Sequence, residues 1–262
     1  MKLEFWHKDM IRFMTDASEY GDYYQQLTEK MLLWLRKDMH ICDAGSGLGY
    51  LSLALAPHVR QVTAVEKHPD AAAVLTDNCR KHQIGNVISR CGSIDEVLPA
   101  EKYDAMVFCF FGGIQHTLEL AKQQCRGDVF VFTRNYRNHR FSAGNLPTGW
   151  DGYPEFKNLL EELEIPFQQQ TLALEFGQPF RDLPDARLFF ELYSKDQDTS
   201  MVTEEFLRSK LVESGREDFP WYSPHQRQIA FLHFSVNDIP DHIGSGGTRD
   251  RIFAKLPYML EK

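Results

Sequence analysis

The sequence has no long apolar run and no regular arrangement of cysteines. No stretch of its 262 residues approaches the roughly 18 apolar residues of a membrane span, and residues 1–15 lack the apolar core of a signal peptide. Its five cysteines are odd in number and form no C-x-x-C pair, which disfavours a disulfide framework or a zinc site. We therefore expect a cytoplasmic protein whose cysteines are reduced core residues, namely Cys42, Cys79, Cys91, Cys109 and Cys125.

Positive charge and metal-ligand motifs are also scarce. The chain has 29 basic and 37 acidic residues, a net charge of -8, which disfavours a broad face for nucleic acid, so we expect no nucleic acid among its partners. Ten histidines are present without a His-x-x-x-His or His-Glu-x-x-His motif, and we expect no metal. With 43% hydrophobic residues, the chain can bury one full core.

The most informative motif is a glycine-rich segment that directly follows an apolar run. The letters Ile41-Cys42-Asp43-Ala44-Gly45-Ser46-Gly47-Leu48-Gly49 have the pattern of a strand, a tight turn and the start of a helix. A dinucleotide loop follows G-x-G-x-x-G, whereas here the third glycine comes one residue early. Asp43 would also repel a pyrophosphate. The loop therefore favours a cationic ligand over NAD.

This segment resembles the first motif of class I S-adenosylmethionine-dependent methyltransferases. Three later segments, 62–66, 87–95 and 103–111, extend the resemblance over roughly residues 30 to 135. It implies S-adenosylmethionine as the cofactor, with Glu66 accepting from the ribose hydroxyls about 20 residues after the loop. Ser93 or Asp95 is the candidate contact to the adenine. The cofactor-binding residues that we predict are Asp43, Gly45, Ser46, Gly47, Gly49, Glu66, Lys67, Ser93, Ile94 and Phe108.

Strand and helix patterns alternate through the middle of the chain. We expect strands at 39–43, 61–66, 86–91, 103–109 and 128–133, and helices at 49–57, 69–83 and 115–125. This alternation is typical of a parallel sheet covered on both faces. The resemblance implies that strands at 170–176 and 227–236 form an antiparallel end. The predicted fold class is α/β, a doubly wound, mainly parallel, Rossmann-like sheet of the class I methyltransferase type.

Two segments lie outside the alternating core, which comprises residues 37–176 and 226–240 of a single domain. Helical periodicity over residues 4–36 predicts an N-terminal helical cover of residues 1–36, whose apolar stripe is Leu27, Met31, Leu32, Trp34 and Leu35. Residues 177–225 are too long for a hairpin turn and contain helix patterns at 185–193 and 203–211. We predict a helical insertion that covers the substrate. A core extension and a subunit interface are the alternatives.

Methyl transfer requires a nucleophile held in line with the methyl group and the exclusion of water, rather than a metal. Residues 108–111 lack the Asn/Asp-Pro-Pro-Tyr/Phe motif with which amino-methylating nucleic-acid enzymes and glutamine-methylating enzymes of the class grip their substrates. No catalytic residue is assigned. His116 is a weak candidate for a general base, with a helix-surface position as the alternative. Candidate substrate-binding residues are Tyr20, Tyr24, Phe110, Phe111, Arg134 and Arg137, with packing or a solvated loop as alternatives.

The sequence thus predicts an S-adenosylmethionine-dependent methyltransferase that acts on a small molecule, as a monomer or homodimer. A protein methyltransferase is the first alternative, and a non-catalytic cofactor-binding regulator or assembly subunit is the second. A metal-dependent catechol-type enzyme is a minor alternative, and a dinucleotide oxidoreductase comes last because of Asp43 and the glycine spacing.

Overall fold

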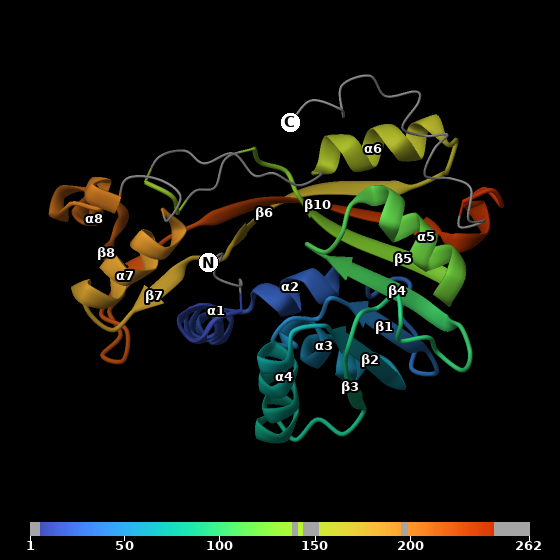
Figure 1. The fold of residues 1–262 in the computed structure, drawn as a ribbon, viewed down its shortest axis with the longest axis horizontal. Coiled ribbons are helices and arrows are strands. Elements are labelled where there is room, and N and C mark those ends of the chain that lie inside the picture. The colour runs from blue at the N-terminus through green and yellow to red at the C-terminus, as the bar shows by residue number, and fades with distance from the viewer. Residues whose placement is uncertain (1–5, 138–140, 144–151, 195–198, 244–262) are drawn as a thin grey trace.

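The centre of the protein is a seven-stranded sheet with the strand order β3-β2-β1-β4-β5-β10-β6 (Figure 1). The computed structural model describes residues 6–137, 141–143, 152–194 and 199–243. Strands β1 to β5 pair in parallel, whereas β10 is antiparallel to both β5 and β6. The predicted fold class and its antiparallel end are confirmed. The strands are β1 His40–Ala44, β2 Gln61–Glu66, β3 Val87–Cys91, β4 Tyr103–Cys109, β5 Cys125–Arg134, β6 Gln168–Glu175 and β10 Gln226–Ser235.

Helices cover both faces of this sheet and bury two separate apolar clusters. Leu118 of α5 and Leu160 of α6 pack with Phe108 on one face, and Leu27 of α2 packs with Phe130 on the other. All five side chains are shielded completely from solvent. The helices are α1 Lys8–Tyr20, α2 Tyr23–Glu29, α3 Tyr50–Leu55, η1 Ala56–His58, α4 Pro69–Lys81, α5 Ile114–Gln124, α6 Tyr153–Glu162 and η3 Val236–Asp238. The helix α6 was not predicted from the sequence.

Local sequence explains why these elements begin and end where they do. The helix α4 starts with Pro69, whose missing N–H is not needed in the first turn. Asp70 in its first turn and Arg80 and Lys81 in its last turn match the helix dipole. The central strand β1 is covered on both faces, so its residues from Ile41 to Ala44 are buried without alternation.

The N-terminal region differs from the single helical stripe that we predicted. Helix α1 ends at Gly21, α2 follows, and the chain leaves the helical conformation after Glu29. Leu27 and Met31 are buried as predicted, but the side chain of Leu32 is 41% exposed. The prediction for Leu32 was wrong because the 3.6-residue period no longer applies beyond the end of α2.

The prediction that the cysteines are core residues was wrong for Cys91. All five thiols are free, and Cys42 and Cys125 are buried in central strands. Cys91 is exposed because it ends β3, which is an edge strand of the sheet. An edge strand has a neighbour on one side only, so less of its surface is covered.

The segment between β6 and β10 forms a small lobe, defined here as residues 178–223. The expected helix patterns correspond to α7 and α8, but the lobe also contains a three-stranded sheet, β7-β9-β8, that the sequence did not reveal. The prediction of a purely helical insertion was therefore incomplete. The elements are β7 Gln178–Phe180, α7 Leu183–Tyr193, η2 Thr199–Met201, α8 Glu204–Lys210, β8 Val212–Glu213 and β9 Trp221–Ser223.

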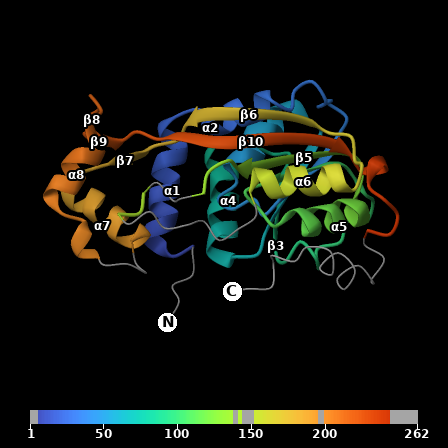
Figure 2. The same ribbon diagram turned by 90° about the horizontal axis from the view of Figure 1, so that it is seen from above.

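The lobe packs against α1, at one end of the molecule (Figure 2). Phe13 of α1 belongs to the aromatic cluster of the lobe, and its ring centroid lies 5.0 Å from that of Phe189 and 6.2 Å from that of Phe180. Most of the aromatic side chains of the insertion are thus used for its own core. Aromatic pairs at these separations prefer such edge-to-face geometry.

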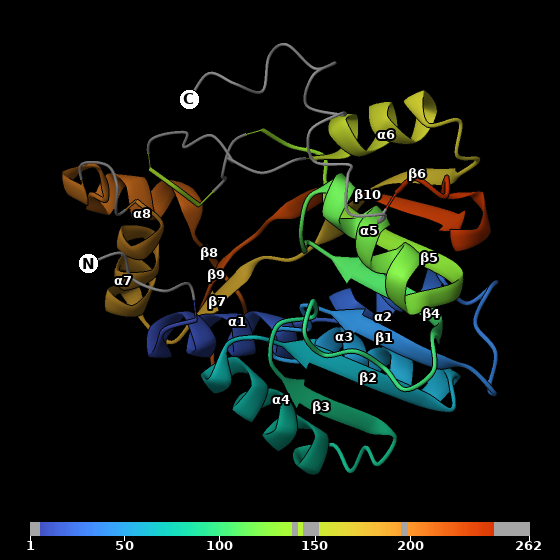
Figure 3. The same cartoon turned by 45° about the vertical axis from the view of Figure 1, so that its right-hand side comes forward.

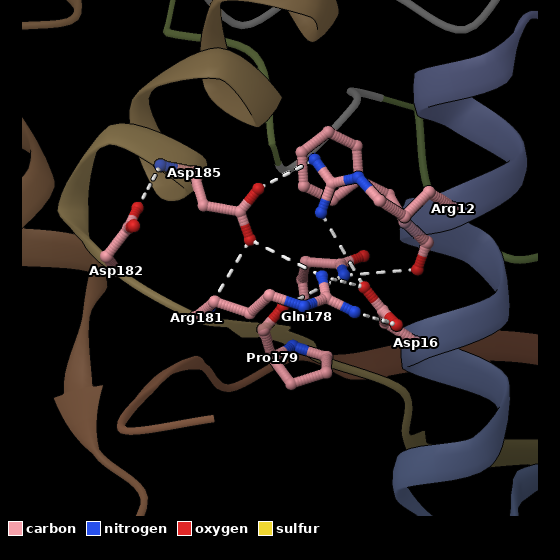
Figure 4. Close-up of polar contacts among 8 residues, drawn as sticks. Arg12, Asp16, Gln178, Pro179, Arg181, Asp182 and Asp185 are labelled. Atoms are coloured by element: carbon pink, nitrogen blue, oxygen red, sulfur yellow. Dashed lines mark hydrogen bonds and ion pairs between the residues drawn. The ribbon is translucent and has the colours of Figure 1, made fainter. Parts of the chain in front are cut away.

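Charged side chains reinforce the contact between α1 and the lobe (Figure 4). The Arg181 guanidinium donates two hydrogen bonds to the Asp16 carboxylate, at 2.6 and 2.8 Å. Arg12 forms an ion pair with Asp185 at 2.6 Å, and the Gln178 amide donates to the backbone oxygen of Phe13 at 3.1 Å. Because Asp16 is almost fully buried, its pairing with arginine is required there.

Replacement of Arg181 should weaken this attachment. In Arg181→Met the two hydrogen bonds to Asp16 are lost while most of the apolar length is kept, and we expect the free energy of unfolding to fall by about 1 to 2 kcal/mol. The matched control is Arg208→Met, because the Arg208 side chain is 84% exposed and its ion pair with Glu204 spans 4.0 Å. The control should change stability by less than about 0.5 kcal/mol in urea denaturation. Equal effects of both substitutions would contradict the proposed attachment.

Candidate functional site

The glycine loop lies at the point where the strand order changes direction, between β1 and its neighbours β2 and β4. In open α/β sheets ligands bind outside the carboxyl ends of the strands at this point. Gly45, Gly47 and Gly49 all have positive φ angles, of 70°, 53° and 85°. A Cβ atom at Gly45 would lie 2.2 Å from the Phe111 ring, and one at Gly49 would lie 2.5 Å from Leu75. Both the backbone conformation and the close packing therefore require glycine.

Glu66 fixes the shape of this loop from the end of β2. Its buried carboxylate accepts a hydrogen bond from the backbone N–H of Gly47 at 2.9 Å and another from that of His68 at 2.8 Å. The predicted cofactor residue Glu66 therefore lies directly at the loop. The adjacent Lys67 is exposed. Ser46 lies within the loop, and its buried hydroxyl has no hydrogen-bond partner among the residues that the structure describes.

Asp43 lies beneath the loop rather than on its surface. Only 1% of the residue is exposed, and the Ser52 hydroxyl donates to its carboxylate at 2.6 Å. Burial and, to a smaller extent, the nearby charge of Glu66 together raise the pKa of Asp43 from 3.8 to about 6, although the Ser52 hydrogen bond lowers it. The negative charge that we predicted from the sequence is thus close to the loop, but the carboxylate is buried beneath it and does not reach its surface.

The predicted adenine-side loop is joined to the start of α5. The Ser93 hydroxyl donates to one oxygen of Asp95 at 3.0 Å, and the Nε2 of His116 lies 2.8 Å from the other. The hydrogen bond from His116 holds the pKa of Asp95 below its usual range. Ile94 is buried in the core. His116 therefore belongs to the same group of side chains as Ser93 and Asp95.

The end of β4 presents two phenylalanines to opposite sides of the sheet. Phe110 has a positive φ of 54° and packs with the α2 side, while Phe111 packs with the α5 side and against Gly45. Phe108 is fully buried in the core. The indole of Trp6 lies 3.0 Å from where a Cβ atom of Gly47 would be, so Trp6 covers the loop from a second side. The sequence analysis did not identify Trp6, because contacts of this kind have no local pattern.

The structure separates the two tyrosines that we predicted to bind substrate. Tyr24 stacks on Tyr50 at 5.9 Å and contacts Phe176 at 6.0 Å, near the end of β4. Tyr20 instead stacks on Tyr222 of the lobe at 4.7 Å. Arg134 ends β5 at the same edge as the glycine loop, and Arg137 is exposed beyond it. The remaining part of that basic segment, 138–140, lies outside the described residues.

A further arginine, Arg227, was missed by the sequence analysis. It is the second residue of β10, and its guanidinium carbon lies 3.8 Å from the centroid of the Phe110 ring. Because β10 runs antiparallel to β5, its first residues lie at the edge where β5 ends. The sequence did contain a signal for this position, namely a charged residue at the start of a mostly apolar strand. It would have had to be combined with the antiparallel pairing of that strand.

Two searches over the described residues gave negative results. No group of three or more His, Cys, Asp or Glu side chains in ranges 6–137, 141–143, 152–194 and 199–243 could hold a metal ion. In that same part of the chain, no helix is both long enough and apolar enough to span a membrane.

Comparisons with known proteins show that the glycine loop lies in a segment similar to known methyltransferases. Residues 41–127 match the family model described as a methyltransferase domain. The YcgJ protein from Bacillus subtilis has a similar structure, with a TM-score of 0.54 and 12% identity over 82% of this chain and 98% of that chain. A SAM-dependent methyltransferase from Aquifex aeolicus has a TM-score of 0.51 and 16% identity over 64% of this chain and 93% of that chain. At these identities the likeness is one of fold.

The curated relatives correct one of our predictions. An uncharacterized RNA methyltransferase from Lactobacillus johnsonii is 32% identical over 68 residues, which are 26% of this chain. The 23S rRNA (uracil(1939)-C(5))-methyltransferase RlmD from Chromohalobacter salexigens is 36% identical over 70 residues, 25% of this chain. Each match spans 15% of the relative's length. The expectation that nucleic acid is excluded as a partner was therefore wrong, because the net charge of a whole chain does not determine its local surface.

The buried Asp43 carboxyl should make stability depend on pH in a defined direction. Its pKa in the folded protein, about 6, exceeds its ordinary 3.8, so its contribution is fully present below about pH 4 and is lost as the pH rises to about 6. In Asp43→Asn that loss is absent. The unfolding free energy of the variant relative to the natural protein should therefore rise by up to about 3 kcal/mol from pH 4 to 7. Denaturant titrations at several pH values measure this difference, and a constant difference would contradict the buried charge.

The sheet, the glycine loop and the family model all relate this chain to methyltransferases. The sheet is mainly parallel and has the antiparallel end that the sequence resemblance implied, and the glycine loop lies at its switch point. A methyltransferase family model covers the loop and the strands β1 to β4. Residues 41–127 therefore match a methyltransferase domain, and the sheet around them has the Rossmann-like fold of class I S-adenosylmethionine-dependent methyltransferases.

Proposed function

We propose that this chain transfers a methyl group from S-adenosylmethionine to an acceptor bound at the end of β4. The observation that carries the proposal is the glycine loop at the switch point, whose backbone is held by the buried carboxylate of Glu66. The match to a methyltransferase family model over residues 41–127 supports it.

The residues at the loop fit this cofactor. The buried hydroxyl of Ser46 lacks a partner among the described residues, so a polar ligand at the loop would satisfy it. Glu66 uses each oxygen for one backbone N–H, and a carboxylate oxygen can accept a further hydrogen bond from a ribose hydroxyl. The loop with Asp43, Glu66 and the adenine-side residues Ser93 and Asp95 would hold the cofactor. When bound, S-adenosylmethionine supplies a methyl group already activated by a sulfonium.

The remaining chemical requirement is positioning, and the aromatic side chains around the end of β4 are suited to it. Phe110, Tyr24 and Phe176 form a largely apolar surface there, which would orient a planar acceptor and exclude water. No strong acid is needed to activate the leaving sulfur. We do not assign His116 as a base, because its ring is bonded to Asp95 on the adenine side.

For the acceptor, we propose a small molecule, because the aromatic surface beside β4 is partly buried rather than open. RNA is the second candidate, and the matches to two RNA methyltransferases favour it. Transfer of labelled methyl groups into a metabolite extract or into total RNA distinguishes the two. Label in the RNA fraction that is removed by ribonuclease would select the second candidate.

We also propose that the lobe covers the acceptor. Figures 1 and 3 draw β4 with its arrowhead toward the side on which α1 and the lobe lie. A cavity of about 30 Å³ lies between α1 and the lobe, and its lining includes Met14 from α1, Phe176 from directly after β6 and Tyr193 from the lobe. Covers of this kind exclude water and select substrates.

The cofactor assignment predicts a selective response to ligands. S-adenosylmethionine and its demethylated product should raise the melting temperature and release heat on titration, because both bind the folded state preferentially. NAD should do neither, since Asp43 and the glycine spacing disfavour a pyrophosphate. Tight binding of NAD together with no response to the methyl donor would refute the assignment.

The role of the lobe predicts a separation of donor binding from transfer. Replacement of residues 181–222 by a short Gly/Ser loop should leave donor binding measurable and abolish transfer to the acceptor. Because that variant exposes Phe13 of α1, Arg181→Met provides a milder test: turnover should fall while donor affinity stays within about twofold. Normal turnover in a shortened protein that folds and binds the donor would eliminate the cover.

A further inference from the structure

We propose that Arg227 binds an anionic group, a carboxylate or phosphate, on a small planar acceptor. This inference rests on the proposed function and names the chemistry of its acceptor. Arg227 lies beside Phe110 at the end of β4, where the acceptor of a methyl group would approach the cofactor loop.

The strand pairing places Arg227 at this edge. In the register between β10 and β6, Arg227 is paired with Leu174, one residue before the end of β6. The next residue, Gln228, accepts a hydrogen bond through its backbone oxygen from Asn135, which directly follows β5. Arg227 is therefore fixed at the start of β10, next to the carboxyl ends of β4 and β5.

Aromatic rings surround the guanidinium of Arg227. Its central carbon lies 3.8 Å from the ring centroid of Phe110, 5.6 Å from that of Phe176 and 5.9 Å from that of Tyr23. Phe110 directly follows β4, Tyr23 begins α2, and Phe176 directly follows β6. Contacts over a ring face hold the plane of a guanidinium while its N–H groups remain able to donate at the edge.

No carboxylate of the described residues forms an ion pair with Arg227. Glu175 is the acid of the paired strand β6 that lies next to Leu174, the partner of Arg227. Its carboxylate instead accepts hydrogen bonds from the Tyr222 hydroxyl, the His225 backbone N–H and the Gln226 side-chain amide. By contrast, Arg12 is paired with Asp185, and Arg181 is paired with Asp16. Within the described residues, Arg227 is thus a half-buried cation that is faced by aromatic rings and by no carboxylate.

Electrostatics then favour an incoming anion. A guanidinium withdrawn from water without a counter-charge is destabilised, and ring contacts compensate for only part of that cost. A carboxylate or phosphate can accept two parallel N–H bonds from the same guanidinium. The buried hydroxyl of Tyr23 also lacks a partner among the described residues. Burial raises the pKa of Tyr23, so this hydroxyl remains a neutral hydrogen-bond donor.

The aromatic environment favours a planar acceptor of small size. Phe110, Phe176 and Tyr24 offer ring faces for stacking. A carboxylate or phosphate carried on such a ring could reach Arg227, and a phosphate of RNA carries the same kind of charge. An RNA phosphate is therefore the competing source of the anion, and the experiment below distinguishes it from a small molecule.

The test compares three probes in the presence of the demethylated cofactor product: benzoate, phenyl phosphate and the neutral analogue benzamide. Binding is followed by ligand-observed NMR titration. At least one anionic probe should bind at least tenfold more tightly than benzamide, and Arg227→Gln should abolish that preference. The matched control is Arg80→Gln, because the Arg80 side chain is 75% exposed on α4, and it should behave as the natural protein. Which anion binds more tightly identifies carboxylate or phosphate as the natural group.

Several results would overturn the inference. One is equal binding of all three probes, and another is an unchanged preference in Arg227→Gln. If that variant does not fold, Arg227→Lys replaces it and should bind the preferred probe at least threefold more weakly, because lysine lacks the planar fork. Binding of a single-stranded RNA that depends on Arg227, without binding of either small anion, would assign the residue to RNA. Failure of the natural protein to bind the demethylated product would instead refute the proposed function.

Discussion

The carboxylate of Glu66 is the constraint on which the cofactor loop depends. It ends β2, yet it accepts hydrogen bonds from the backbone of Gly47 in the loop and of His68 before α4. Because both partners are backbone groups, the loop after β1 and the loop after β2 cannot move independently of each other. The same carboxylate lies close enough to Asp43 to raise its pKa, so two acids are concentrated at one small site. Such a site is electrostatically prepared for a cationic ligand.

The helix α1 has a comparable role for the remainder of the molecule. Its apolar face supplies Phe13 to the core of the lobe, and its acid Asp16 pairs with Arg181. Tyr20 extends the same contact by stacking on Tyr222. The lobe and the N-terminal helix therefore form one structural unit, although about 165 residues separate Asp16 from Arg181 in the sequence.

The sequence predicted what local patterns determine and missed what tertiary contacts determine. Strand positions agreed closely, as for β2 at Gln61–Glu66, because buried parallel strands form continuous apolar runs. The glycine loop was recognisable because positive φ angles require glycine at fixed spacing. Trp6 and Arg227 were missed, since each reaches the site from a distant segment. Leu32 was placed incorrectly because the helix ended before it.

The error about nucleic acid has the same origin as the omission of Arg227. A net charge of -8 is a sum over the whole chain, whereas recognition depends on the few groups that a ligand touches. In the part of the chain that the structure describes, several arginines are neutralised by acids, as in the pair of Arg126 with Asp104. Such pairs contribute little to recognition, because their charges are already compensated. Arg227 contributes one positive charge to the sum, but no acid of the described residues pairs with it, so we infer that it influences the choice of acceptor more than the total charge does.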